Sequence, residues 1–157
     1  MNLFFLSKNP VAAAQMQCDK HVVKMILETA QMLCTAHHVN GSTLDTDVLY
    51  KKTHVNHPST VWCRTSTSNY TWAYDHFVAL CDEYTHRYGK VHLTDTKLRE
   101  LLKTVPTMSA DAFTKAPKCM PTEYQTGSLI QSYQNYYYYT KRSFAKYTNR
   151  SVPAFMV

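Results

Sequence analysis

The chain has 157 residues, 45% of them hydrophobic, so it is long enough for one domain with its own core and unlike a disordered or collagen-like protein. No segment approaches the roughly 18 consecutive apolar residues of a membrane-spanning helix, which excludes an integral membrane protein of that type. Seventeen Lys and Arg residues against eleven Asp and Glu give a net charge of +6, and twelve tyrosines accompany them. Basic charge interleaved with flat aromatic rings is typical of nucleic-acid-binding proteins, although composition alone leaves other basic proteins open.

The N-terminal stretch MNLFFLSKNP is hydrophobic but has neither a basic region before the apolar run nor an A-x-A cleavage site, so we expect no secretory signal. The five cysteines are an odd number and include no C-x-x-C pair. This usage predicts reduced thiols and a cytoplasmic location, in the host cell if the protein is phage-encoded.

Helix start and stop signals predict an all-α fold, a compact single-domain bundle over residues 1–157. Asn9-Pro10 predicts a first helix, and a break near Cys18-Asp19 precedes a long helix that ends at Asn40-Gly41. Residues 2–6 are too few for a sheet and are predicted to pack as a tail beside this long helix. Further helices are expected near 58–62, over 69–88 after a cap at Ser68 or Asn69, over 96–105 after a cap at Asp95, and over about 123–146. The 69–88 helix carries one apolar stripe at helical spacing, expected to face the core: Tyr70, Ala73, Phe77, Cys81, Tyr84 and Tyr88.

One face of the long second helix is polar. At 100° per residue, a single sector holds Lys20, His21, Lys24, Glu28, Gln31, Thr35 and His38. The sector could be a solvated face with one Lys24–Glu28 ion pair. It could also be a functional face, because a lone carboxylate flanked by cations suits proton transfer beside a phosphate-binding surface. The part built from Lys20, Lys24, Glu28 and Gln31 cannot be core, because it lacks acidic partners for two buried lysines.

A second polar segment runs His54-Val55-Asn56-His57-Pro58-Ser59. Two histidines three residues apart could ligate zinc, but no further ligands follow at metal-site spacing, so we expect neither a metal nor another cofactor. A histidine at a loop-to-helix junction more often binds a phosphate or satisfies the loop backbone. The motifs GxxxxGK[ST], GxGxxG and GxSxG are absent, which leaves nucleotide-binding loops and the serine-hydrolase elbow unsupported.

The order of motifs is distinctive: DKHVVKMILETAQ, then NHPSTVW, then a long aromatic helix that ends EYTHRYGK, then an aromatic and basic C-terminal part. Over roughly residues 1–92 this order resembles the pyrimidine-dimer DNA glycosylase family, which includes phage endonuclease V, and more closely its divergent phage and bacterial members. Beyond residue 100 only aromatic and basic character matches.

The resemblance implies a DNA repair glycosylase with associated AP-lyase activity on damaged pyrimidines in duplex DNA. The family's N-terminal α-amine attacks C1′, displaces the base and forms a Schiff base, and β-elimination then cuts the strand. Carried over by position, the catalytic residues are Met1, Glu28 and His57. The expected DNA-binding residues are Lys20, His21, Lys24, Gln31, Asn56, Arg64, Lys141 and Arg142. The expected partner is double-stranded DNA with a damaged or modified base. We expect the protein to bind it as a monomer and to have no membrane partner.

This chemistry is physically coherent, because an α-amine titrates near 7.7–8.0 and a lysine near 10.4, so more of the α-amine is a free nucleophile at neutral pH. It predicts that the Met1 amine lies within a few Å of the Glu28 carboxylate, with His57 lining the same cleft. In the phage enzyme the initiator methionine is removed, whereas here Asn2 follows Met1, and a residue of this size usually prevents removal. The arginines that flank the family's glutamate are here Leu27 and Gln31.

Two other functions remain open from the sequence. One is a non-enzymatic nucleic-acid-binding protein on the same scaffold. The other is a His-assisted nuclease or nucleotide hydrolase that uses His54 and His57. The cluster Tyr136 to Tyr139 spans about 300° of a helix, so we expect part of it to pack against the 69–88 helix and part to form an exposed stacking surface.

Overall fold

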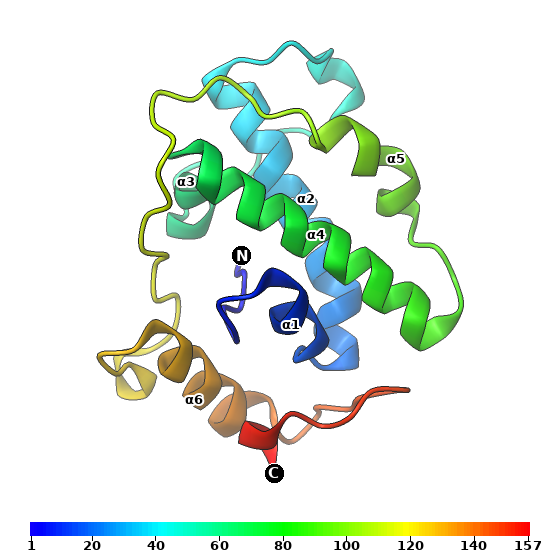
Figure 1. Cartoon of the computed structure of the whole chain (residues 1–157), viewed down its shortest axis with the longest axis vertical. Helices are drawn as coiled ribbons and strands as arrows, with labels where there is room; N and C mark the ends of the chain where they lie inside the picture. The colour runs from blue at the N-terminus through cyan, green and yellow to red at the C-terminus, as the bar shows by residue number, and fades with distance from the viewer.

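The computed structural model describes residues 1–157 and is helical throughout, with no β-strand, as predicted (Figure 1). The six α-helices are α1 (Pro10–Gln15), α2 (Asp19–Asn40), α3 (Pro58–Cys63), α4 (Thr67–Tyr88), α5 (Leu93–Leu102) and α6 (Leu129–Lys141). Three short 3-10 turns lie at Thr46–Val48, Thr122–Tyr124 and Ala154–Met156. None of the helices is both long and apolar enough to cross a membrane.

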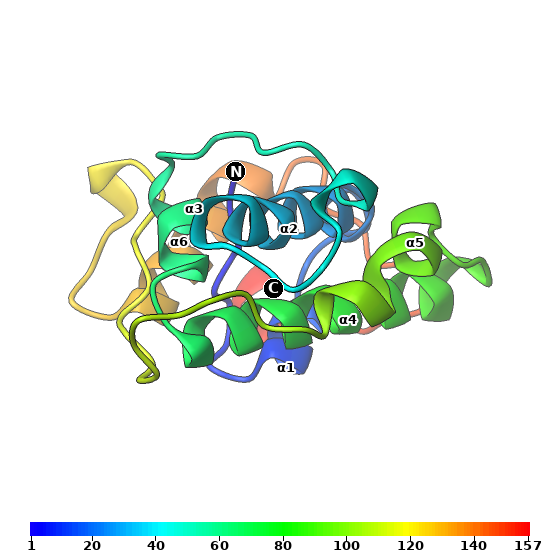
Figure 2. The same ribbon diagram turned by 90° about the horizontal axis from the view of Figure 1, so that it is seen from above.

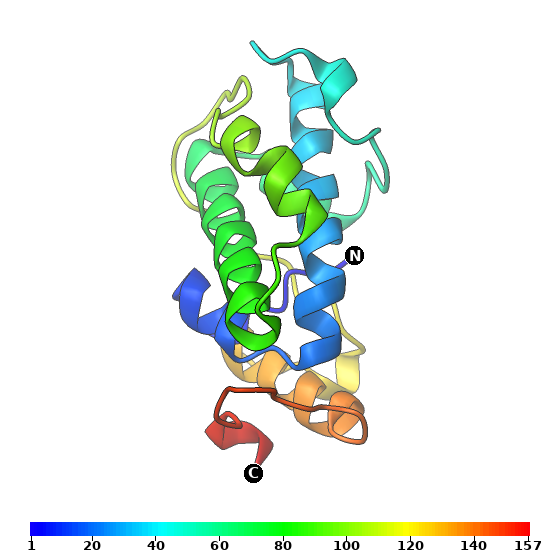
Figure 3. The ribbon, with the colours of Figure 1, turned by 90° about the vertical axis from the view of Figure 1, so that its right-hand side faces the viewer.

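The two 22-residue helices, α2 and α4, form the frame of the molecule and run side by side (Figure 3). Each has an apolar stripe at helical spacing, and residues such as Ile26 and Leu33 of α2 and Phe77 of α4 are fully buried between them. α1 packs on α4, while α3 and α5 pack on both long helices. The molecule therefore has two faces. One carries α2 and α3, and the other carries α4 with α1 packed on it.

The N-terminal segment threads through this frame. Figure 2 shows it running from the face that carries α2 and α3 to the opposite face, where α1 lies. Residues Leu3 to Leu6 are at most 4% exposed, which confirms that this tail is packed. Phe5 alone joins three helices, because its ring lies 5.2 Å from Trp62 of α3, 4.2 Å from Trp72 of α4 and 5.9 Å from Tyr133 of α6. At about 1.5–3 kcal/mol for each buried apolar side chain, residues 3–6 contribute roughly 6–12 kcal/mol as an upper bound.

α6 packs on the N-terminal segment and the start of α2. The buried Tyr137 hydroxyl accepts from the Cys18 backbone N–H (2.9 Å), and the Tyr137 ring lies edge-on to Phe4 at 5.4 Å. The expectation that this cluster packs against the 69–88 helix was therefore wrong. An amphipathic helix shows which of its faces is apolar but not which other helix will cover that face.

Several predicted boundaries also need correction. Ser66 caps α4, so this helix begins two or three residues earlier than expected. His92 caps α5 through Nδ1, a role that sequence rules assign to Ser, Thr, Asp or Asn, and Asp95 instead pairs with Arg99 inside the helix. α6 begins after a cap at Ser128 and ends at Lys141, shorter than predicted.

The core-facing stripe of α4 holds for only part of its length. Tyr70, Phe77 and their neighbours Ala73 and Cys81 are buried, but Tyr88 is 37% exposed. In this last part of α4 the buried residues are instead Glu83 and Arg87, and Gly89 ends the helix in the left-handed conformation (φ 66°), as its sequence position predicted.

We predict that Leu6→Ala lowers the free energy of unfolding by about 2–5 kcal/mol, because Leu6 is fully buried where the N-terminal segment crosses the frame. Val39→Ala on the surface of α2, where the valine is 44% exposed, is the matched control and should change it by less than about 0.5 kcal/mol. Urea unfolding followed by circular dichroism measures both. Equal, small effects would show that the segment is not part of the core.

Candidate functional site

A pocket of about 520 Å³ opens on the face that carries α2 and α3. Its walls come from the first residues of the chain, α2, the start of α3, the segment 117–120 and α6. Its charged and titratable lining consists of the Met1 amine, His21, Lys24, Glu28, His57, Lys118, Cys119, Tyr136 and Lys141. Glu28 is the only carboxylate in this lining, so the pocket carries an excess of positive charge.

The N-terminal amine and Glu28 meet in this pocket. The Met1 nitrogen lies 3.3 Å from Glu28 Oε1, as the sequence predicted, and Lys24 Nζ lies 3.8 Å from Glu28 Oε2. The side chains of Met1 and Glu28 are only 2% and 16% exposed, whereas Lys24 is 65% exposed. A mostly desolvated carboxylate therefore faces an amine on one side and a solvated lysine on the other.

His57 lines the same pocket, again as expected, and occupies the N-cap of α3. Its Nδ1 accepts from the Ser59 backbone N–H at 3.1 Å, so the proton of the neutral ring sits on Nε2. Burial, the positive charge of the N-terminal amine and His54 lower the pKa of His57, against an opposing contribution from Glu28. A neutral ring that keeps an Nε2–H donor at physiological pH follows from these contacts.

His21 reaches the pocket from the first turn of α2 and is 7% exposed. Its Nδ1 lies 2.7 Å from the Tyr137 hydroxyl, which itself accepts from the Cys18 N–H and so can donate to His21. The same hydroxyl lies 3.3 Å from Cys18 Sγ, which is a second acceptor for its proton. Burial, followed by the charges of Lys141, Lys24 and Lys20, lowers the pKa of His21 to about 4.

Aromatic rings line the wall next to these histidines. The Phe4 ring stacks on His21 at 4.6 Å and on Tyr136 at 6.5 Å, and Lys141 Nζ lies 4.6 Å above the Tyr136 ring. Tyr139 is 67% exposed, which leaves one face of the tyrosine cluster open to solvent as expected. The pocket wall therefore combines stacking surface with a cation held in place.

Not every predicted DNA-binding residue lies in the pocket. His21, Lys24 and Lys141 line it, but Lys20, Gln31, Asn56, Arg64 and Arg142 do not. Lys20 Nζ lies 4.9 Å above the Phe144 ring, and Arg142 lies over Tyr138 at 4.6 Å, so both are exposed cations outside the pocket. Asn56 is exposed and directly precedes His57, and Gln31 is half-buried one turn beyond Glu28.

One residue was placed wrongly by the sequence, and the role of another stays a prediction. Arg64 follows α3 outside the pocket and is half-buried, with its Nη1 buried and without a hydrogen-bond partner, and its part in DNA binding stays a prediction. Thr35, assigned to the polar sector of α2, is fully buried beneath the 50–54 loop, whose Thr53 N–H donates to its hydroxyl (3.2 Å). Helical spacing places residues on a face but cannot show that a loop covers part of that face.

The structure also brings in residues that the sequence did not suggest. Lys118 and Cys119 line the pocket from an irregular segment rich in proline. Cys119 accepts a hydrogen bond at its carbonyl oxygen from Asn2 Nδ2 (3.0 Å), across 117 residues of chain. No local pattern predicts a contact at that separation. The only available signal was the basic and aromatic character of the C-terminal part.

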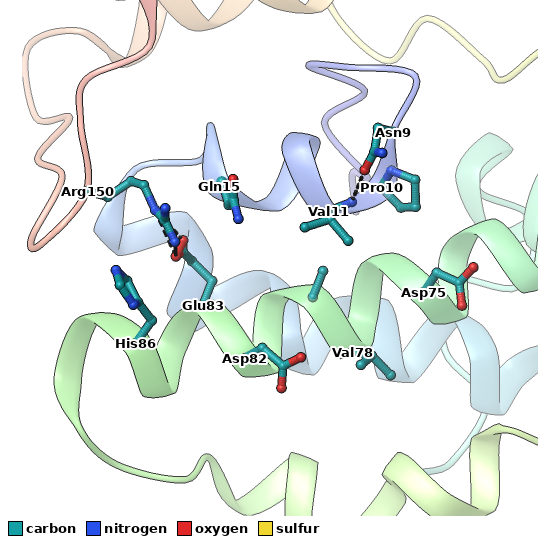
Figure 4. A pocket seen from close by; sticks show the side chains of 11 residues that line it. Asn9, Pro10, Val11, Gln15, Asp75, Val78, Asp82, Glu83, His86 and Arg150 are labelled. Carbon is teal, nitrogen blue, oxygen red and sulfur yellow. Dashed lines mark hydrogen bonds and ion pairs between the residues drawn. The ribbon is translucent and has the colours of Figure 1, made fainter.

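The second large cavity lies between α1 and α4 on the other face, with a volume of about 450 Å³. Figure 4 shows Asp75, Asp82 and Glu83 along the α4 side of it, with Arg150 paired to Glu83 (Nε to Oε1, 3.1 Å). Three carboxylates against one arginine make this face unfavourable for a polyanion. Of these two cavities, the pocket that holds Glu28 is therefore the one better suited to nucleic acid.

The chemistry available at the Glu28 pocket is that of an amine nucleophile beside a carboxylate, with cations and neutral imidazoles around them. No three His, Cys, Asp or Glu side chains are grouped so as to hold a metal ion. An amine, a proton acceptor and cations are the groups that imine-type chemistry on an anionic substrate requires.

The profile of the family described as pyrimidine dimer DNA glycosylase matches residues 1–97, and the chain therefore belongs to this family. Members of a DNA glycosylase family act on DNA, so DNA is the substrate class. The match contains Met1, His21, Lys24, Glu28 and His57, and it ends before the segment 117–120 and α6. No curated protein and no solved structure matches the chain.

The buried histidines predict a pH dependence of stability. Burial lowers the pKa values of His21, His37 and His76 to about 4, whereas an unfolded histidine titrates near 6.5. Between these values the unfolded state binds more protons, so the free energy of unfolding falls as the pH is lowered from about 6.5 to 4. Urea unfolding at several pH values should show a shallower fall for His21→Gln than for the unaltered protein. Identical slopes would contradict a neutral, buried His21.

Proposed function

We propose that this protein is a DNA glycosylase with associated AP-lyase activity that acts on damaged pyrimidines in duplex DNA. The observation that carries the proposal is the Met1 amine at 3.3 Å from Glu28 Oε1, inside a pocket with three lysines and no other carboxylate. Membership in the pyrimidine dimer DNA glycosylase family supports the same substrate class. A carboxylate repels phosphate, so Glu28 adds nothing to the DNA affinity of a cationic pocket.

In the first step the neutral Met1 amine attacks C1′ of the damaged nucleotide. The bond from C1′ to the base nitrogen breaks, and the base leaves with the bonding electrons and takes up a proton. The attached nitrogen then loses one proton. The C1′–O4′ bond of the sugar ring breaks, O4′ takes up a proton, and the nitrogen lone pair forms the C=N bond of an iminium at C1′ that keeps one N–H. Glu28, in contact with the amine, is the acceptor for a proton released there.

In the second step a base removes a proton from C2′ of the iminium. The electrons of that C–H bond form a C–C double bond, and the C3′–O bond breaks, so the 3′ phosphate leaves and the strand is cut. Glu28 is the nearest carboxylate for this proton as well. The lysines of the lining, Lys24, Lys118 and Lys141, bind the phosphates on either side and stabilise the leaving phosphate.

The two histidines serve as neutral hydrogen-bond donors in this proposal. His57 keeps a proton on Nε2, and His21 stays neutral with one ring N–H at physiological pH, for the reasons given above. Such donors can bind an oxygen of the sugar, the phosphate or the damaged base without adding charge to a pocket that already holds several cations.

The chain acts as a single unit of 157 residues and as a monomer on its DNA. Support comes from the pocket itself, because its walls combine the first residues, α2, α3 and α6 of one chain. All five cysteines are free thiols, which suits action in the cytoplasm of the cell that holds the DNA.

Glu28→Gln should reduce strand cleavage by about 10²–10⁴-fold and leave DNA affinity nearly unchanged, because it keeps the shape of the side chain but removes a proton acceptor. Single-turnover cleavage of an oligonucleotide duplex with one cyclobutane dimer measures the rate, and fluorescence anisotropy measures affinity. Gln31→Glu is a matched control that places a carboxylate one turn away and should not restore cleavage to Glu28→Gln. Undiminished cleavage by Glu28→Gln would exclude Glu28 as the proton acceptor.

Binding should depend steeply on salt, because lysines contact phosphates. If about five phosphates are neutralised, log K falls with log[salt] at a slope near −4 to −5. Lys24→Ala and Lys141→Ala should each make the slope shallower by about 0.9, whereas Lys97→Ala on α5, outside the pocket, should not change it. Anisotropy titrations at four salt concentrations test this. An affinity that does not vary with salt would contradict the assignment of this pocket to DNA.

A further inference from the structure

The first two residues are held more tightly than a chain terminus requires. Asn2 is 9% exposed and makes two hydrogen bonds through its side chain. Its Oδ1 accepts from the Phe4 backbone N–H (2.8 Å), and its Nδ2 donates to the Cys119 carbonyl oxygen (3.0 Å). Both polar atoms of the side chain are therefore used, one toward the N-terminal segment and one toward the opposite wall of the pocket.

The backbone around Asn2 is also constrained. Phe4 has φ 49°, in the left-handed region that a residue with a side chain seldom adopts. Its carbonyl oxygen accepts from the Leu6 N–H (2.7 Å), and its ring stacks on His21. The Asn2 side chain binds the Phe4 N–H in this conformation, so it stabilises the turn that directs the first residue toward Glu28.

The pocket accommodates both the amine and the side chain of Met1. Its side chain is 2% exposed while its amine contacts Glu28, so the methionine side chain fills space at the site. Residues 3–6 are buried in a fixed register, and adjacent Cα atoms lie 3.80 Å apart. Without Met1 the new terminal amine of residue 2 would begin one residue further from Glu28.

We propose that Asn2 is a positioning residue that holds the Met1 amine against Glu28, and that the active form of this protein keeps its initiator methionine. The inference rests on the proposed function, because it concerns the amine that acts there. Asn2 keeps the Met1 amine at this position in two ways. Its size prevents removal of Met1, and its two hydrogen bonds fix the direction of the amine between the N-terminal segment and residue 119.

The test separates these two roles with two variants. Asn2→Leu keeps a large second residue, so Met1 is retained, but it removes both hydrogen bonds. Asn2→Ser has a small second residue, which permits removal of Met1. Leu98→Ala is the stability control, since Leu98 is fully buried in α5, which contributes nothing to the pocket. Intact-mass spectrometry identifies the N-terminus of each protein, and melting temperatures show that each is folded.

The readouts are the saturating rate of borohydride trapping on duplex DNA with one abasic site, and the affinity for that DNA. We expect the unaltered protein to carry Met1. Asn2→Leu should trap at a rate lower by about tenfold or more, and Asn2→Ser without Met1 at a rate lower by about 100-fold, because a displacement of about 1 Å can cost that factor. DNA affinity should stay within about twofold for both, and Leu98→Ala should trap at the original rate.

Three results would overturn the inference: an unaltered protein that lacks Met1 and still traps, Asn2→Leu trapping at the original rate, or a loss of trapping matched by Leu98→Ala. Failure of the unaltered protein to trap at all is a different outcome, because it contradicts the proposed function itself.

Discussion

The fold depends on the burial of an apolar N-terminal segment whose first residue carries the charged ammonium group of the chain. Residues 3–6 cross the interior between α2 and α4, and the ammonium group before them cannot remain in that interior without a counter-charge. Glu28 supplies the counter-charge on the central part of α2, 3.3 Å from the amine. The length of the buried segment thus sets the place where the amine emerges. The carboxylate that stabilises the amine in the folded state is also the group that can accept its proton in a reaction.

The C-terminal third of the chain completes the pocket, and ion pairs and hydrogen bonds hold it against α2 and α4. Arg87 of α4, whose side chain is fully buried, pairs with Asp19 at the start of α2 (3.0 Å) and with Glu83 (3.6 Å). Arg150 donates to the same Glu83, and the Thr148 N–H donates to Asp19. These bonds hold the tail that follows α6 against both long helices. Removing one partner would leave an uncompensated buried charge, so the network fixes the position of the tail that follows α6.

The part of the chain that matches the family profile does not contain the whole pocket. The family profile ends at residue 97, whereas Lys118, Cys119, Tyr136 and Lys141 line the pocket from beyond it. The amine, the carboxylate and both histidines lie inside the matched part. The lysines and the tyrosine that we propose for phosphate binding and base stacking lie partly outside it. The proposed chemistry thus belongs to the family's part of the chain, while the shape of the pocket also depends on the rest.

Local rules predicted much of the structure, and long-range contacts explain what they missed. The caps at Asn9 and Gly41 fixed α1 and α2, and helical spacing placed Lys24 and Glu28 on one accessible face. The sequence could not show that Asn2 bonds Cys119 across 117 residues, since neither position has a local pattern that specifies a partner. Thr35 was misplaced for a related reason. Its helical position lies in the polar sector of α2, but the 50–54 loop covers it through a contact with Thr53 that spans 18 residues of chain.

In the proposed reaction the α-amine of Met1, and not a lysine of the same pocket, reacts with DNA. Borohydride trapping of the unaltered protein on an abasic duplex, followed by protease digestion and mass-spectrometric mapping of the attached residue, tests this most directly. We expect the DNA remnant to be bound to the amine of the N-terminal peptide that begins with Met1. Attachment to Lys24, Lys118 or Lys141, all of which line the pocket, would contradict it.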